Sequence, residues 1–199
     1  MMSQSYEEQL NKHFQPLVQK HGASHKSVNW GSESSQNLRF KMLLSFDPKE
    51  GQSLLDLGCG VGHLFKFIEA NYPGINYKGI DLVPDMISQA KQSYPQTDFE
   101  KADILEKNWE NSFDLVVASG IFYIGCDYDG MFACLESMWK SARKVISFNS
   151  LSSWASEKDE GEFYADPLKV VDYCRSLSSK VILRHDYMPH DFTVQVFRD

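Results

Sequence analysis

From residue 51 onward, short apolar runs alternate with amphipathic segments, and this alternation constrains the fold more than any other feature of the chain. The run SLLDLG (53–58) precedes an amphipathic segment that ends at a Pro-Gly pair, and YKGIDL (77–82) precedes a second one. FDLVVASGIF (113–122) is apolar almost throughout, as expected of a strand buried on both faces. Repeated strand–helix units predict an α/β fold with a parallel sheet and helices on both faces.

The chain closes with a different pattern. Asp166 and Pro167 suit the cap and first turn of a helix. KVILRHDY (180–187) and FTVQVFR (192–198) follow, separated only by a short polar turn. Two strands joined in this way should pair antiparallel.

Residues 1–50 differ from the rest in charge and pattern. They carry six basic and five acidic residues, net +1, against −8 for the remainder of a chain whose total is −7. Helical spacing predicts one helix ending near Gly22, which Pro16 could kink, and a second helix over 36–46. We expect 1–50 to form a helical lid and 51–199 to form one compact unit.

Composition excludes several classes of protein. With 20 Lys+Arg against 27 Asp+Glu and no basic block, the chain should not bind nucleic acid unaided. It has neither an apolar run of membrane-spanning length nor the pattern of a secretion signal. No two of its four cysteines form a C-x-x-C pair, which favours reduced thiols in a cytoplasmic protein.

A glycine-rich turn, DLGCGVG (56–62), ends the first strand and lets a ligand approach bare backbone. A pyrophosphate-binding turn would place its third glycine where His63 stands. Asp81, at the end of the second strand, could accept hydrogen bonds from both hydroxyls of a ribose, and Asp103 from the amine of adenine. Both carboxylates could instead cap turns. The set suits an adenosine ligand that lacks a phosphate.

In this order, LLDLGCGVGHL, GIDLVPDMI, KADIL and FDLVVASGIFYI resemble the successive motifs of class I S-adenosylmethionine-dependent methyltransferases, strongly over 53–149. The resemblance implies a Rossmann-like, mostly parallel sheet of seven strands with one antiparallel strand. It implies S-adenosyl-L-methionine as cofactor and S-adenosyl-L-homocysteine as product.

The resemblance also implies roles for individual residues. Those expected around the methionine part are Asp56, Gly58, Gly60, Ser119 and Gly120; Asp81 would hold the ribose, with Leu82, Met86, Asp103 and Ile104 at the adenine. Leu82 and Met86 could equally be core. Arg39 could pair with the cofactor carboxylate, or be a surface arginine of an amphipathic helix.

The residues that bind the acceptor are harder to predict from the sequence. Methyl transfer needs alignment of the reactants and exclusion of water, and it requires no nucleophile motif. Tyr123 and Asn149 follow the fourth and fifth strands, where ligands bind in such sheets, and are the candidate catalytic residues. Further candidates for the pocket wall are Tyr164, His185 and Tyr187, whereas Trp30 is expected in the lid over the cofactor. No N/D-P-P-Y-type motif follows the fourth strand, which argues against methylation of adenine or cytosine amines.

No metal site is expected, because His185 and Asp186 lie on a strand while His190 and Asp191 lie in its turn, so the four need not converge. The sequence therefore favours a monomeric or homodimeric methyltransferase of a small-molecule acceptor. One alternative is a non-catalytic cofactor-binding partner subunit. Another is an RNA or protein methyltransferase that needs a partner.

Overall fold

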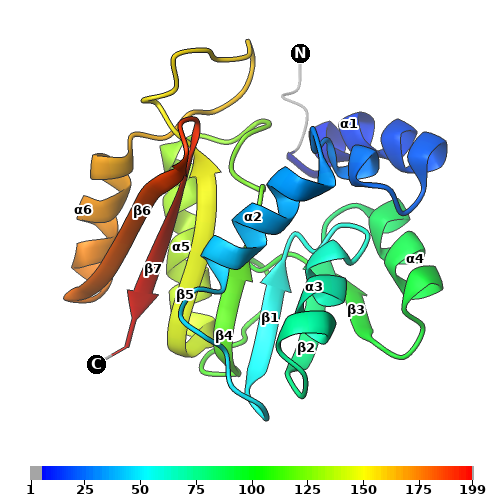
Figure 1. Cartoon of the computed structure of the whole chain (residues 1–199), viewed down its shortest axis with the longest axis horizontal. Helices are drawn as coiled ribbons and strands as arrows, with labels where there is room; N and C mark the ends of the chain where they lie inside the picture. Colours follow the sequence, from blue (N-terminus) through cyan, green and yellow to red (C-terminus); the bar gives the residue numbers. More distant parts are fainter. Residues whose placement is uncertain (1–5, 199) are drawn as a thin grey trace.

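A seven-stranded sheet organises the chain, in the order β3-β2-β1-β4-β5-β7-β6 (Figure 1). The computed structural model describes residues 6–198. The strands are β1 (Ser53–Leu57), β2 (Asn76–Asp81), β3 (Asp98–Lys101), β4 (Phe113–Ala118), β5 (Ala142–Leu151), β6 (Lys180–Met188) and β7 (Asp191–Phe197). β7 runs antiparallel to both β5 and β6, and the other pairs are parallel. The predicted mostly parallel sheet with one antiparallel strand is confirmed.

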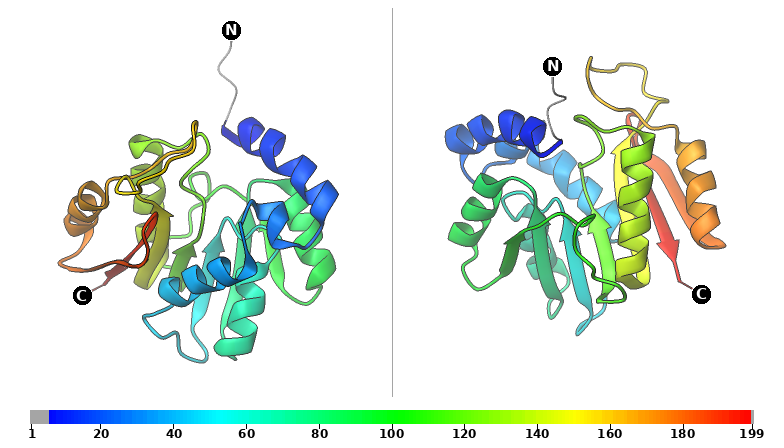
Figure 2. Two further views of the ribbon diagram at one scale, coloured as in Figure 1. Left: turned by 45° about the horizontal axis from the view of Figure 1, so that its top comes forward. Right: turned by 180° about the vertical axis from the view of Figure 1, so that it is seen from behind.

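Helices cover both faces of the sheet, as predicted. They are α1 (Tyr6–His21), the 3-10 helix η1 (His25–Val28), α2 (Glu33–Leu43), α3 (His63–Asn71), α4 (Pro84–Ser93), α5 (Tyr128–Ser141) and α6 (Pro167–Leu177). α2, α3 and α4 lie on one face, and α5 and α6 lie on the other (Figure 2). Within residues 6–198, no helix is long and apolar enough to cross a membrane.

Two helices, α4 and α6, begin where proline and capping residues in the sequence predict a helix start. Pro84 and Pro167 occupy the first turns of α4 and α6, where the missing N–H costs no hydrogen bond. The Asp166 side chain accepts a hydrogen bond from the Leu168 amide and caps α6. α1 continues through Pro16 and ends before Gly22, whose φ is +55°.

The second helix is displaced from its expected range. α2 begins at Glu33 instead of residue 36, because the Ser32 hydroxyl caps it by accepting from the Ser35 amide at 3.1 Å. α2 is also part of the core rather than only a cover. Phe40 and Leu43 are buried, and the Ser147 hydroxyl of β5 donates to the Leu43 carbonyl at 2.7 Å.

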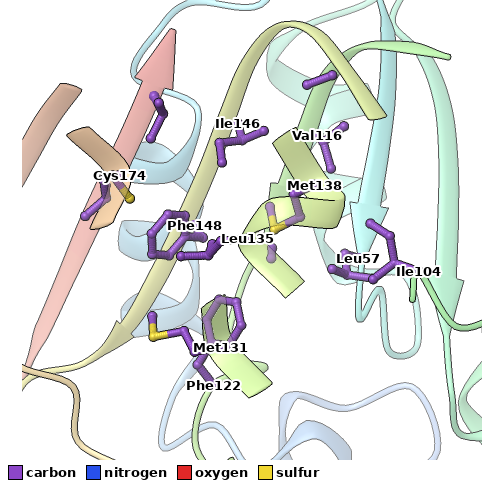
Figure 3. Close-up of a cluster of buried hydrophobic side chains, with 14 of the residues drawn as sticks. Leu57, Ile104, Val116, Phe122, Met131, Leu135, Met138, Ile146, Phe148 and Cys174 are labelled. Atoms are coloured by element: carbon purple, nitrogen blue, oxygen red, sulfur yellow. The ribbon is translucent and has the colours of Figure 1, made fainter. Parts of the chain in front are cut away.

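The larger core cluster lies between the sheet and α5 (Figure 3). Its fully buried side chains include Val116, Ile146 and Phe148 from the strands and Leu135 and Met138 from α5. This packing fixes the central strands, and therefore the turns that leave their carboxyl ends. The candidate site is built from those turns.

The first helix lies across the carboxyl edge of the sheet, beside α4 (Figures 1 and 2). Val18 of α1 is buried against Val61, Val83 and Met86. α1 therefore covers the ends of the strands that carry the glycine turn.

Candidate active site

A cavity of about 370 Å³ opens at the carboxyl ends of β1, β2 and β4. A volume of this size is within the usual range for a small-ligand site. All the predicted cofactor residues line it except Arg39; they are Asp56, Gly58, Gly60, Asp81, Leu82, Met86, Asp103, Ile104, Ser119 and Gly120. We call this space the first cavity.

The glycine turn lets the backbone pass close to its neighbours. Gly58 has φ +71°, and a Cβ there would lie 2.2 Å from Cγ2 of Ile121. Gly60 has φ +55°, and its Cβ would lie 2.9 Å from Cγ1 of Val28. Any larger residue would be strained by its φ and would push Ile121 or Val28 aside.

Asp81 both holds this turn and lines the first cavity. Its Oδ2 accepts from the Gly60 amide at 2.9 Å, and its Oδ1 accepts from the Val83 amide at 2.8 Å. Burial raises the pKa of Asp81, and these two hydrogen bonds oppose that rise. Asp103 similarly accepts from the Leu105 amide at 2.8 Å while it lines the cavity. The capping role weighed for both carboxylates is therefore present alongside their position at the cavity.

Asp56 is the most deeply placed carboxylate, with 2% of its surface exposed. Its Oδ2 accepts a hydrogen bond from the Tyr77 hydroxyl at 2.5 Å. Burial raises the pKa of Asp56 to about 7, against the opposing effect of the Tyr77 hydrogen bond. Its Oδ1 has no hydrogen-bond partner among residues 6–198, although the residue lines the cavity. Tyr77 was not singled out from the sequence, where it reads only as a strand residue.

The first cavity is lined by acidic side chains without a Lys or Arg among the described residues. These acidic side chains are three carboxylates. Such a lining favours a cation and disfavours a pyrophosphate. S-Adenosylmethionine carries a sulfonium and an ammonium group together with hydroxyls and an adenine, so the donors and acceptors present fit it.

The N-terminal segment contributes to the wall of the first cavity. Tyr6, Leu10 and Phe14 of α1 line it, and none of the three was predicted to do so. Helical periodicity identifies an apolar face but not the surface on which that face packs. Trp30 also lines the cavity, and a Cβ on Gly120 would lie 2.9 Å from its indole Cζ2. The indole therefore packs directly on the turn after β4.

A second, more polar cavity of about 830 Å³ adjoins the first. The two share Val28, Trp30, Gly120, Phe122 and Tyr123 as a common wall. The rest of the second cavity is formed largely by the segment 149–164 and by the β6–β7 turn.

Both candidate catalytic residues line the second cavity. Asn149 is buried; its Oδ1 accepts from the Gly120 amide at 2.9 Å, and its Nδ2 donates to Ser119 Oγ at 3.0 Å. The Tyr123 hydroxyl makes no hydrogen bond within the described chain. Burial, together with the nearby charge of Glu162, raises the pKa of Tyr123. Asn149 thus shapes the turn after β4, while Tyr123 keeps a free hydroxyl at the common wall.

Arg39 does not reach the first cavity. It is buried, and its Nε lies 2.7 Å from Oδ2 of Asp191, which is buried too. Its guanidinium also lies 3.1 Å from Nε2 of His190 and 4.6 Å over the Trp30 ring. It lines the second cavity instead. It is therefore not a surface arginine either, because β7 lies beside α2 and supplies a buried partner.

The four residues considered as a metal group are each engaged with other side chains, and His190 and Asp191 both contact Arg39. His185 bonds to Ser152 Oγ at 2.7 Å, Asp186 pairs with Arg184, and Asp191 pairs with Arg39. Within residues 6–198, no three His, Cys, Asp or Glu side chains are grouped so that they could hold a metal ion. Tyr164 lines the second cavity, whereas His185 and Tyr187 line neither.

The strand order reverses between β1 and β4, and the first cavity lies at that point, where doubly wound sheets bind nucleotides and related cofactors. Together with the antiparallel β7, this defines the class I methyltransferase fold. Residues 54–144 match the family described as the methyltransferase domain. Rv1506c of Mycobacterium tuberculosis, named as a methyltransferase, is 34% identical over 158 residues, covering 72% of this chain and 92% of that protein. The chain belongs to the S-adenosylmethionine-dependent methyltransferases.

Other relatives agree with this assignment. Trans-aconitate 2-methyltransferase of Escherichia coli is 33% identical over 115 residues, which are 56% of this chain and 44% of that enzyme. The chain thus spans less than half the length of that relative. The crystal structure of magnesium protoporphyrin IX methyltransferase from Synechocystis with bound S-adenosylmethionine superposes with a TM-score of 0.73 over the whole of both chains, at 12% identity. At 12% identity, the similarity to this crystal structure supports the fold alone.

Proposed function

We propose that this methyltransferase acts on a small-molecule acceptor that occupies the second cavity and meets the methyl group at the common wall. The observation that carries the proposal is that wall. Trp30, Gly120 and Tyr123 each face both cavities, so a ligand in one lies next to a ligand in the other. An in-line transfer needs this adjacency.

In this proposal the first cavity holds the cofactor. Asp56 faces its cationic methionine end, Asp81 accepts from the ribose hydroxyls, and Asp103 accepts from the adenine amine. Leu82, Met86 and Ile104 give apolar contact with the adenine, and Gly58, Gly60, Ser119 and Gly120 provide backbone at the methionine part. When bound, S-adenosylmethionine supplies a methyl group that its positive sulfur already activates.

The chain itself aligns the acceptor and excludes water. We infer that α1 and Trp30 belong to an N-terminal lid over the cofactor, within 1–50. The raised pKa keeps the Tyr123 hydroxyl protonated, so it serves as a hydrogen-bond donor to the acceptor rather than as a base. Asn149 acts through the turn after β4, because its amide bonds both Ser119 and Gly120.

Several features support a small acceptor. The net charge of −7 disfavours an unaided nucleic-acid substrate. The relatives include one named for trans-aconitate and one, from Acetivibrio thermocellus, named for malonyl-[acyl-carrier protein]. A monomer or homodimer remains our proposal, because residues of one chain line both cavities. The four cysteines are free thiols, consistent with a cytoplasmic setting.

The test is a screen with labelled S-adenosylmethionine against a metabolite panel and against RNA. We expect methylation of a small molecule, with activity that varies little with salt. Tyr123→Phe should lower turnover and leave the affinity for S-adenosylhomocysteine within about twofold, because it changes only the acceptor side. The matched control is Tyr173→Phe, which removes a hydroxyl that bonds the Phe132 carbonyl outside both cavities.

Preference for RNA, with a steep loss of activity between low and moderate salt, would overturn the small-molecule proposal. An unchanged turnover in Tyr123→Phe would remove Tyr123 from the acceptor side.

A further inference from the structure

The cofactor's methionine end carries a carboxylate, and the first cavity presents no cation to receive it. No Lys or Arg lines this cavity within residues 6–198, and Arg39 is held by Asp191 on the other side of Trp30. A cofactor carboxylate placed in this acidic cavity, at the end that Asp56 lines, needs at least one hydrogen-bond donor. The donor must therefore be a neutral group.

Gln36 is the polar side chain that α2 places in the first cavity. It stands one helical turn before Arg39, is 4% exposed, and lines the cavity. Its Nε2 lies 3.1 Å from Nδ1 of His63, the first residue of α3. One Nε2 hydrogen and Oε1 have no partner in the described part of the chain. These free positions of the amide are therefore available to a ligand in the first cavity, which Gln36 lines.

His63 determines which way this amide points. Its Nε2 lies 2.8 Å from the Ala23 carbonyl oxygen, which can only accept, so Nε2 carries the proton. Burial lowers the pKa of His63 and so favours the neutral ring. Nδ1 is then an acceptor, and Gln36 must turn its Nε2, not its Oε1, toward the ring.

We propose that Gln36, oriented by His63, donates a hydrogen bond to the carboxylate at the methionine end of the cofactor, in place of Arg39. The inference rests on the cofactor occupying the first cavity as proposed above. It also explains why the position that would complete a pyrophosphate turn carries a histidine: the imidazole links the glycine turn to the lid. His63 is a positioning residue in this arrangement.

The experiment compares two ligands of the full chain by calorimetry. S-Adenosylhomocysteine and its decarboxylated analogue differ only by the carboxylate. Gln36→Met, which keeps the side-chain length, should weaken S-adenosylhomocysteine about tenfold and leave the analogue within about twofold. His63→Leu should give a smaller loss with the same selectivity, which a purely structural role would not produce. The control Asn37→Met alters an exposed amide of the same helix and should change neither affinity.

A second variant guards against misfolding of the first. Gln36→Glu keeps the shape but replaces the donor with a charge, so it should weaken S-adenosylhomocysteine further while holding the cationic analogue at least as tightly. Equal loss for both ligands, or no loss for S-adenosylhomocysteine, would overturn the role of Gln36. Failure of the wild-type chain to bind either ligand would instead refute the cofactor cavity itself.

Discussion

Replacing Asp56 with asparagine should make the unliganded protein more stable at neutral and alkaline pH. The folded protein holds this carboxyl at a pKa of about 7, compared with the usual 3.8. Between these two values the folded state binds a proton that the unfolded chain has lost, so stability falls as pH rises. The full difference is equivalent to about 4 kcal/mol. The asparagine side chain would keep an oxygen to accept from Tyr77 and would remove the charge.

The assay is urea unfolding of the wild type and Asp56→Asn at pH 5 and pH 8, without ligand. We expect the variant to gain about 2–3 kcal/mol relative to wild type between these two pH values, because from pH 5 to about pH 7 the folded wild type keeps a proton that the unfolded chain has lost. The same variant should bind S-adenosylhomocysteine more weakly. A stability difference between variant and wild type that stays constant from pH 5 to pH 8 would refute the raised pKa of Asp56. A variant that is less stable than wild type at pH 8 would refute it too.

Three further changes test other parts of the site. Asp81→Ala should weaken S-adenosylhomocysteine by about 1–3 kcal/mol in calorimetry and leave NAD unbound; unchanged affinity would remove Asp81 from the cofactor site. Cofactor binding should protect residues 6–32 from proteolysis and shift tryptophan fluorescence, with Trp30→Phe as the control; equal cleavage with and without cofactor would argue against a lid. Arg39→Met should lower the free energy of unfolding by about 3–5 kcal/mol in urea, because it leaves the buried charge of Asp191 without a partner. Adding Asp191→Asn to this variant should recover part of the loss; an unchanged stability of Arg39→Met would contradict the buried pair.

Local chemistry made much of the fold readable from the sequence. β4 could be assigned because a parallel strand buried on both faces is usually a nearly continuous apolar run, and the starts of α4 and α6 because proline is favoured in the first turn of a helix. The glycine turn and Asp81 were found for a similar reason, since a tight turn between a strand and a helix has few chemical solutions. Each of these signals lies within a few residues of the structure it specifies.

Contacts between distant segments were not readable in this way. The chain places Arg39 and Asp191 152 residues apart, and Gln36 and His63 27 residues apart. No periodicity links such pairs, because each partner obeys the pattern of its own helix, strand or turn. The sequence therefore determined the sheet, the cofactor class and the carboxylates at the strand ends. Only the packing of α2 against β7 and the glycine turn decided that Arg39 would be neutralised by a buried partner while Gln36 faces the first cavity.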